Sequence, residues 1–302
     1  MKESREWSFQ SIGLKIAMVS WGHRSKSRVL LLHGHGDSAA TFAPLISLLP
    51  DEYYYVSFDF PGHGKSDFLP SGPLPTHTLF LEVIRRVLLH LEWNSFLCIG
   101  HSMGCVLAML HDNLYPGQMA KLVCLDPLFG LMRYTNMADH NSKFVSLMFY
   151  ERYYDTFYHK FCQPTISTYE EALDNVVKHR KLSKEQAKLV LPRNLTPLKD
   201  GLYRVSPQKA AFQTAHIPAT FDILEHIFNN VSLPVLLYHS SQSLAIYNQI
   251  ECSSKSICLF NDKSSLHKVV CFEGIHDQHI VRPDFFVPDI VKFLEESYKS
   301  KL

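Results

Sequence analysis

The chain has 302 residues, and its 30 lysines and arginines nearly balance its 29 aspartates and glutamates. This length suffices for one large core domain, and the balanced charge argues against a nucleic-acid partner. The sequence contains no run of the ~18 apolar residues that a membrane span needs. Residues 1–7 are too charged for a secretion signal, so we expect neither membrane insertion nor secretion.

Strand and helix patterns alternate through the first 126 residues. Strand-like apolar runs lie at 13–22, 28–33, 53–59, 95–99 and 121–126. Helical patterns lie between them, the clearest at 80–91 and 106–111. This alternation predicts an α/β fold with a mostly parallel central sheet flanked by helices.

The alternation stops near residue 127 and resumes with strand-like runs at 234–239 and 266–272. A final helix is expected at 285–298, and a short helix beginning after an N-cap at Ser183 is expected within the interruption. We therefore predict a core domain from residues 1–126 and 233–302, with a helical cap inserted at 127–232. Its aromatic-rich stretch at 144–161 could contact an apolar substrate, although packing inside the cap is the simpler interpretation.

Ser102 stands in a G-x-S-x-G pattern between a strand-like run and a helical run. Glycines at 100 and 104 remove side chains that would crowd a tight strand-to-helix turn. Such a turn exposes the serine hydroxyl beside the first N–H groups of the helix. The pattern leaves two interpretations equally open at this point: Ser102 is a nucleophile, or it is a serine that merely begins a helix.

A serine nucleophile needs an oxyanion hole, a base and an acid. The turn around His35, after the run 28–33, can supply one backbone N–H, and Met103 can supply the other. His33 is expected to brace this turn with its side chain.

The loop after the last predicted strand offers two candidate bases, His276 and His279. His276 is favoured because it comes soon after the strand ends. The H-x-x-H spacing alone does not indicate a metal site, because no third ligand accompanies it. No metal or other cofactor is expected.

The acid does not stand at its usual place in the sequence. The usual position, after the strand near 235–238, reads His239-Ser240-Ser241-Gln242-Ser243 and holds no carboxylate. Asp126, which ends the run 121–126, is the alternative, and the chain order Ser102, Asp126, His276 suits this architecture. An equal alternative is that Asp126 only caps the first turn of the insertion.

Taken together, His33-Gly34-His35-Gly36, residues 59–66, residues 100–104 and Gly274-Ile275-His276 resemble the motifs of the α/β-hydrolase superfamily. Residues 51–59, 82–87, 125–129 and 274–280, with Pro283, are similar to the animal serine hydrolase-like proteins. The resemblance spans nearly the whole chain. It is much more specific for the fold than for the substrate.

The resemblance implies that Ser102 is the nucleophile, that His276 is the base, and that His35 and Met103 form the oxyanion hole. His276 stands seven residues before Pro283, as the base usually does in this superfamily. Gln242 replaces the aspartate of most relatives, and Asp126 matches an alternative acid position used by some haloalkane dehalogenases. Those enzymes and the epoxide hydrolases use an aspartate nucleophile, so Ser102 argues against both chemistries.

The expected function is hydrolysis of an ester or thioester of a small, apolar acyl or aryl substrate through an acyl-enzyme. A catalytically weak or inactive binding protein is the alternative, because Gln242 lacks a carboxylate. Cleavage of a C–C bond by the same serine and histidine is a third possibility.

Two features of the sequence bear on its location in the cell. Seven cysteines without a C-x-x-C pair favour a reducing, intracellular compartment. Ser300-Lys301-Leu302 matches the S-K-L signal that a peroxisomal import receptor recognises at a C-terminus. We expect a peroxisomal protein, or a cytoplasmic one if this signal is not used.

Overall fold

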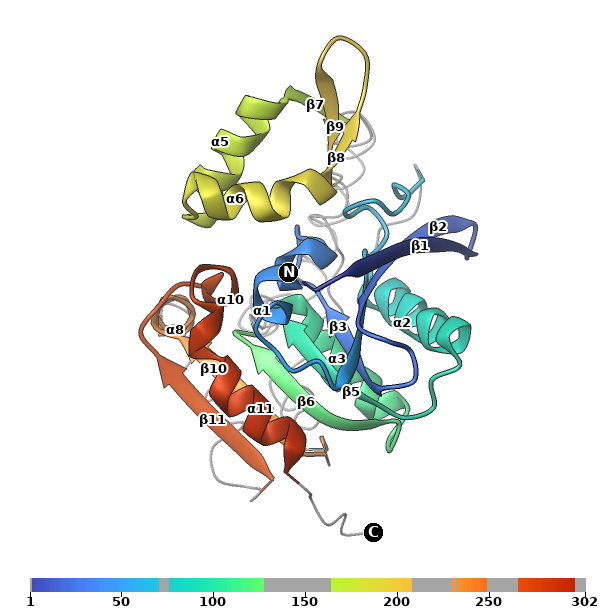
Figure 1. Cartoon of the computed structure of the whole chain (residues 1–302), viewed down its shortest axis with the longest axis vertical. Helices are drawn as coiled ribbons and strands as arrows, with labels where there is room; N and C mark the ends of the chain where they lie inside the picture. The colour runs from blue at the N-terminus through green and yellow to red at the C-terminus, as the bar shows by residue number, and fades with distance from the viewer. Residues whose placement is uncertain are drawn as a thin grey trace, which may run out of the picture.

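The computed structural model describes residues 2–70, 76–127, 164–207, 230–231, 233–248 and 266–296. An eight-stranded sheet forms the centre of the molecule, in the order β1-β2-β4-β3-β5-β6-β10-β11 (Figure 1). The pairs β1–β2 and β2–β4 are antiparallel, and the pairs from β4 to β11 are parallel. The strands are β1 (Ser4–Ser11), β2 (Leu14–Trp21), β3 (Ser27–Leu32), β4 (Tyr53–Phe58), β5 (Phe96–His101), β6 (Met119–Leu125), β10 (Val235–Ser240) and β11 (His267–Phe272).

Helices cover both faces of this sheet, which confirms the predicted fold class. Leu30 and Leu32 of β3 belong to the apolar cluster that includes α2 and α3, whereas Val29 and Leu31 belong to the cluster that includes α1 and α11. Because both faces are buried, the central strands are continuously apolar rather than alternating. The core helices are η1 (Ala39–Phe42), α1 (Ala43–Ile46), α2 (His77–Leu91), α3 (Met103–Leu114), α8 (Ser241–Asn248), α10 (Gln278–Val281), η7 (Pro283–Phe285) and α11 (Val287–Glu295).

Several of these elements differ from the sequence-based expectation, β1 and α11 among them. The sequence did not predict β1, an edge strand whose side chains are mostly exposed or half-buried and therefore give a weak apolar signal. The final helix α11 begins at Val287, two residues after the expected start, because a 3₁₀ turn over Pro283–Phe285 precedes it. Within the described residues, no helix has both the length and the apolar character needed to cross a membrane.

The described part of the insertion, residues 164–207, combines helices with a small antiparallel sheet of order β7-β9-β8. A helical cap was expected here, and these three strands were not located because each has only three or four residues. The expected helix after Ser183 is present as α6, with both hydrogen bonds of a capping box. The elements are β7 (Thr165–Thr168), α5 (Tyr169–Arg180), α6 (Lys184–Val190), η5 (Leu191–Asn194), β8 (Leu195–Pro197) and β9 (Leu202–Val205).

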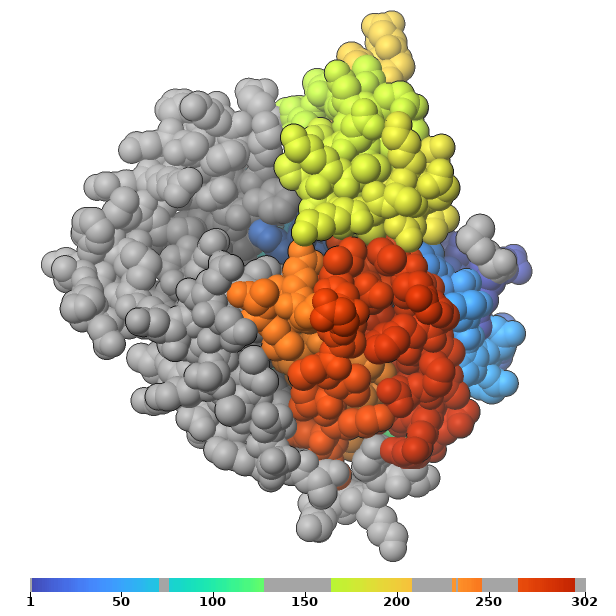
Figure 2. Space-filling view, turned by 90° about the vertical axis from the view of Figure 1, so that its left-hand side faces the viewer, coloured from blue at the N-terminus to red at the C-terminus, as the bar shows by residue number. Residues whose placement is uncertain are grey.

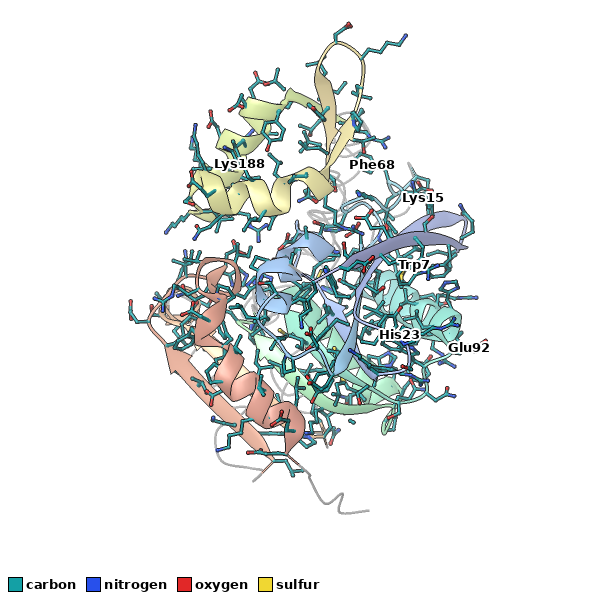
Figure 3. All side chains as sticks on the ribbon, viewed as in Figure 1. Trp7, Lys15, His23, Phe68, Glu92 and Lys188 are labelled. Atoms are coloured by element: carbon teal, nitrogen blue, oxygen red, sulfur yellow. The ribbon has the colours of Figure 1, made fainter. Side chains whose placement is uncertain are left out.

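The insertion packs on the core beside the carboxyl ends of the parallel strands. Ala172 and Leu173 of α5 share an apolar cluster with Ile280 of α10, and Figure 2 shows the insertion lying against the C-terminal part of the core. On the other side, Phe68 lies beneath β9, with the guanidinium carbon of Arg204 4.7 Å from its ring centroid (Figure 3). The division at 127 and 232 stays a prediction, because residues 128–163 and 208–229, including the aromatic-rich stretch, lie outside the described residues.

Candidate active site

Ser102 occupies a strained turn between β5, which ends at His101, and α3, which begins at Met103. Its backbone has φ 51° and ψ −116°, a conformation that residues other than glycine rarely adopt. The Ser102 N–H donates a 3.1 Å hydrogen bond to the carbonyl of Leu125 on the neighbouring strand β6. Strain of this kind at a non-glycine residue is typical of functional sites.

The two glycines of the pattern are required by the close packing of α3 on the sheet. A Cβ atom at Gly104 would lie 2.0 Å from the carbonyl oxygen of Leu32, and one at Gly100 would lie 2.7 Å from the Cys105 nitrogen. Both contacts are with backbone atoms, which cannot rotate away. The packing of this turn therefore requires both glycines of the G-x-S-x-G pattern, as expected for a nucleophile elbow.

The loop after β3 lies directly against Ser102. A Cβ atom at Gly34 would be 3.0 Å from the Cβ of Ser102. The buried ring of His33 braces this loop, because Nδ1 donates to the Gly34 carbonyl (2.8 Å) and Nε2 accepts from the Phe60 N–H (3.0 Å). His35 lines the same pocket as Ser102. Met103 begins α3, and the first N–H groups of a helix have no acceptor within the helix.

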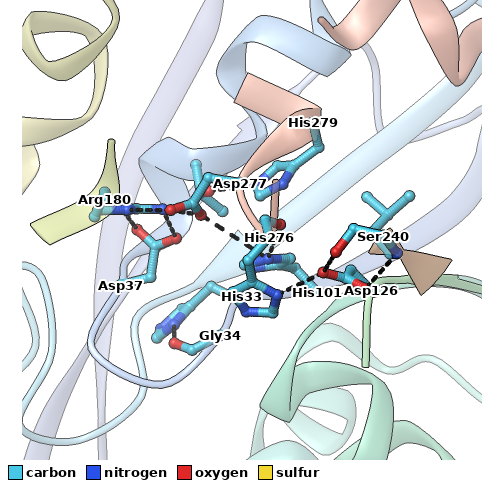
Figure 4. Close-up of polar contacts among 12 residues, drawn as sticks. His33, Gly34, Asp37, His101, Asp126, Arg180, Ser240, His276, Asp277 and His279 are labelled. Carbon is cyan, nitrogen blue, oxygen red and sulfur yellow. Dashed lines mark hydrogen bonds and ion pairs between the residues drawn. The ribbon is translucent and has the colours of Figure 1, made fainter. Parts of the chain in front are cut away.

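Asp126 and His276 meet through a hydrogen bond of 2.7 Å between Oδ2 and Nδ1 (Figure 4). Asp126 directly follows β6, with a left-handed φ of 51°. Its Oδ1 accepts from the Ser240 N–H, and its Oδ2 accepts from the hydroxyls of Ser240 and Ser243, at 2.6 to 2.8 Å. The sequence-predicted acid and base are therefore brought together.

The environment of Asp126 favours its ionised form. Burial acts to raise the pKa of this carboxyl, but the hydrogen bond and charge of His276 and the donors Ser243 and Ser240 outweigh it. The net effect is a pKa below the usual value. A buried carboxylate that accepts a histidine Nδ1–H leaves Nε2 of that ring available as a base.

Gln242, at the usual position of the acid, contacts the backbone of His276 rather than its ring. Its Oε1 accepts a 2.8 Å hydrogen bond from the His276 N–H. The Gln242 N–H in turn donates to the Gly274 carbonyl at 3.3 Å. Gln242 thus holds the loop that carries His276, a contact that the sequence pattern did not indicate.

His279, the other candidate base, lies in a different environment. It is 1% exposed, and its Nε2 lies 2.6 Å from the hydroxyl of Thr41. Burial lowers the pKa of His279 to about 4. His279 packs against the ring of His101 at 4.1 Å between centroids. The geometry favours His276 over His279.

Ser102 and His276 line one pocket of about 440 Å³, within the range of small-molecule sites. The core contributes polar groups to it, and the insertion contributes mostly small apolar and uncharged polar side chains. From the insertion come Thr165, Ser167, Ala172, Asn175, Val176, His179, Arg180, Val205, Ser206 and Pro207.

Arg180, at the end of α5, was not found by the sequence analysis. Its guanidinium donates to both carboxylate oxygens of Asp37 (3.0 and 2.9 Å) and to both of Asp277 (2.9 and 2.6 Å). Asp37 belongs to the His35 loop, and Asp277 follows His276. The two aspartates flank recognisable motifs, but nothing in the sequence links them to an arginine 97 and 143 residues away.

Asp37, His101, Asp277 and His279 have ligand atoms within 4.8 Å of one another, a composition that could suit a cation. Arg180 already occupies both carboxylates with its fork of donors (Figure 4). This cluster is therefore an ion-pair network whose positive charge is supplied by the protein itself.

The sequence profile of the alpha/beta hydrolase fold matches residues 27–251. The chain belongs to the α/β-hydrolase family. This α/β-hydrolase is 30% identical over 291 residues to serine hydrolase-like protein 2 of Homo sapiens, covering 93% of this chain and 90% of that protein. It is 28% identical over 278 residues to a serine hydrolase-like protein of Danio rerio, covering 91% and 83%.

A solved structure, a hypothetical protein of Pseudomonas aeruginosa, resembles this α/β-hydrolase with a TM-score of 0.80 and 20% identity. The match covers 96% of this chain and 99% of that one. At this identity, the likeness shows the fold alone. The family match and the serine hydrolase-like relatives support a hydrolase as the general class of activity.

Proposed function

We propose that this α/β-hydrolase is a serine esterase or thioesterase that acts on a small, apolar acyl or aryl substrate through an acyl-enzyme. The observation that carries the proposal is the 2.7 Å bond between Asp126 and His276 beside the elbow of Ser102. It supports a complete set of nucleophile, base and acid, although Gln242 stands where most relatives have an aspartate.

In the first step, Ser102 Oγ attacks the carbonyl carbon of the substrate while His276 Nε2 takes the hydroxyl proton. Asp126 holds Nδ1–H and stabilises the imidazolium. The N–H groups of His35 and Met103 donate to the oxyanion. Collapse of the tetrahedral intermediate breaks the ester or thioester bond, and the departing alcohol or thiol receives the proton from His276.

In the second step, water attacks the acyl carbon on Ser102 and gives a proton to His276. The acid is released when the bond to Oγ breaks and the proton returns to Ser102. No metal or cofactor is needed for either step. The balance is one water consumed for each ester or thioester cleaved.

The pocket lining supports a compact acyl or aryl group. Ala172, Val176, Val205 and Pro207 offer apolar surface in the pocket that Ser102 lines, and Arg180, whose guanidinium is permanently charged, is already paired. The described lining contains no other arginine or lysine to neutralise an anionic acyl group, so neutral substrates should be preferred.

The alternative of an inactive binding protein depended on the missing carboxylate at Gln242. Asp126, which directly follows β6, offers that carboxylate to His276 instead. The missing carboxylate at Gln242 therefore no longer argues for an inactive binding protein. The structure gives no specific observation in favour of C–C bond cleavage.

Hydrolysis of p-nitrophenyl esters and acyl thioesters of increasing chain length tests the proposal. We expect turnover of short neutral substrates by the wild type, loss of turnover in Ser102→Ala and His276→Ala, and an acyl adduct on the peptide that contains Ser102. Turnover that survives in Ser102→Ala would contradict the proposed nucleophile.

We further propose that Ser300-Lys301-Leu302 directs the protein to peroxisomes through the import receptor. These residues lie outside the described residues. A fluorescent protein fused to the N-terminus should enter peroxisomes with the full chain and stay cytoplasmic when the tripeptide is deleted. An unchanged location after deletion would refute the targeting proposal.

A further inference from the structure

Arg180 connects the two loops on which the proposed catalysis depends. Asp37 lies two residues after the proposed oxyanion donor His35, and Asp277 lies one residue after the proposed base His276. Arg180 binds both carboxylates with four hydrogen bonds of 2.6 to 3.0 Å. Figure 4 shows the guanidinium joined to both aspartates.

The charges make this bridge necessary. Asp37 is 3% exposed and Asp277 is 7% exposed, so neither carboxylate has ready access to water. Burial acts to raise the pKa of Asp277, but the hydrogen bonds and charge of Arg180 outweigh it and hold this pKa well below its usual value. Without the guanidinium, two buried negative charges would face each other across the site and push the loops apart.

Each aspartate is also fixed within its own loop, Asp37 by its carboxylate and its N–H and Asp277 by its backbone carbonyl. Asp37 Oδ1 accepts from the Ser38 N–H at 2.8 Å, and the Asp37 N–H donates to the Gly34 carbonyl at 3.3 Å. The carbonyl of Asp277 accepts from the Ile280 and Val281 N–H groups at the start of α10. A movement of either carboxylate would therefore be transmitted to the backbone beside His35 or His276.

The bridge comes from the insertion and not from the core. Arg180 is the last residue of α5, and Ala172 and Leu173 of α5 belong to the same apolar cluster as Ile280 of α10. The placement of the insertion and the spacing of the two site loops are thus tied to one side chain.

We propose that Arg180 is a positioning residue of the reaction, through which the insertion holds the oxyanion loop and the base loop at their working distance. The inference rests on the proposed function. Arg180 does not touch the reacting atoms in this proposal. Since a misplacement of about 1 Å can cost about 10²-fold in rate, loss of the bridge should act mainly on kcat.

The chain provides a matched control in Arg193 of η5. Arg193 also joins the insertion to a buried core carboxylate, with Nε 2.9 and 3.0 Å from the two oxygens of Asp59. It also pairs with Glu6 at 2.9 Å. Arg193 is not among the residues that line the Ser102 pocket. If replacing either arginine destabilises the protein but only replacing Arg180 lowers kcat, the loss of catalytic geometry is separated from the loss of stability.

The experiment compares wild type, Arg180→Lys, Arg180→Gln and Arg193→Gln with a short p-nitrophenyl ester, with melting temperature measured in parallel. For Arg180→Gln we expect kcat to fall by about 10- to 100-fold, with KM changed less than about threefold. Arg180→Lys keeps the charge but cannot bind both carboxylates as a fork, so it should be intermediate. Arg193→Gln should melt earlier and keep kcat within about twofold.

Equal kcat values for folded Arg180→Lys and wild type would overturn the proposal, as would equal falls in kcat for Arg180→Gln and Arg193→Gln. If Arg180→Gln does not fold, Arg180→Lys decides the question. A wild type without turnover on any ester or thioester would contradict the proposed function instead, so the two failures are distinct.

Discussion

Replacing Asp126 by asparagine tests the least expected member of the site. Oδ2 of Asp126 accepts from His276 Nδ1 (2.7 Å) and from the hydroxyls of Ser243 (2.6 Å) and Ser240 (2.7 Å), and Oδ1 accepts from the Ser240 N–H (2.8 Å). An asparagine supplies one oxygen in place of two. In either orientation of the amide, its NH₂ group faces at least one donor.

The two orientations have different consequences for His276. If the amide oxygen keeps the bond to Nδ1–H, the NH₂ group opposes the Ser240 N–H, a buried mismatch that costs about 1–3 kcal/mol of stability. If the NH₂ group faces Nδ1 instead, the ring must carry its proton on Nε2 and can no longer accept one from Ser102. Losing a charged hydrogen bond worth about 1.5–3 kcal/mol lowers turnover about 10- to 150-fold, and the wrong tautomer can cost about 10⁴-fold.

We therefore expect Asp126→Asn to reduce kcat on a p-nitrophenyl ester by about 10- to 10⁴-fold. Ser240→Ala is the control, because it removes one hydroxyl donor to Asp126 and leaves the bond to His276. It should lose no more than about tenfold. Melting temperatures confirm that both variants are folded. A folded Asp126→Asn with turnover within about threefold of wild type would refute the assignment of Asp126 as the acid.

Three further outcomes follow from the structure. Gln242→Ala removes the acceptor of the His276 N–H and should lower kcat about two- to tenfold, while the melting temperature changes by no more than a few degrees. An unaffected kcat would show that this contact does not position His276. Gly104→Ala places a Cβ 2.0 Å from the Leu32 carbonyl oxygen and should abolish soluble expression or turnover; a stable, active variant would contradict the elbow packing. Burial lowers the pKa values of His111, His239 and His279 to about 4, so the folded protein binds fewer protons than the unfolded chain below pH ~6.5. Stability should fall as the pH falls from ~6.5 toward 4, by about 2 kcal/mol per histidine at pH 5, and a melting temperature that is constant from pH 7 to 5 would contradict this.

Local pattern was enough to predict the parts of the site that depend on short segments. The elbow at Ser102 depends on two glycines and on the strand and helix beside it, all within one short stretch of sequence. Asp126 and His276 were predicted because parallel strands end at one edge of the sheet, which brings their following residues together. The bond between them confirms that the two side chains meet there.

Contacts between distant segments could not be predicted in the same way. Arg180 meets Asp37 and Asp277 only because the insertion packs on the core, and no periodicity in the sequence encodes that placement. The contact of Gln242 with the backbone of His276 is likewise a result of how two loops approach. The strands β7, β8 and β9 are too short to produce a recognisable alternation.

The central claim is that Ser102 is a nucleophile activated by His276. Fluorophosphonate labelling of the purified wild type, beside Ser102→Ala and His276→Ala, tests it most directly because it requires no knowledge of the substrate. The account predicts labelling of the wild type, none in Ser102→Ala and much slower labelling in His276→Ala. A folded wild type that is not labelled would contradict it and would favour a binding protein built on the same turn.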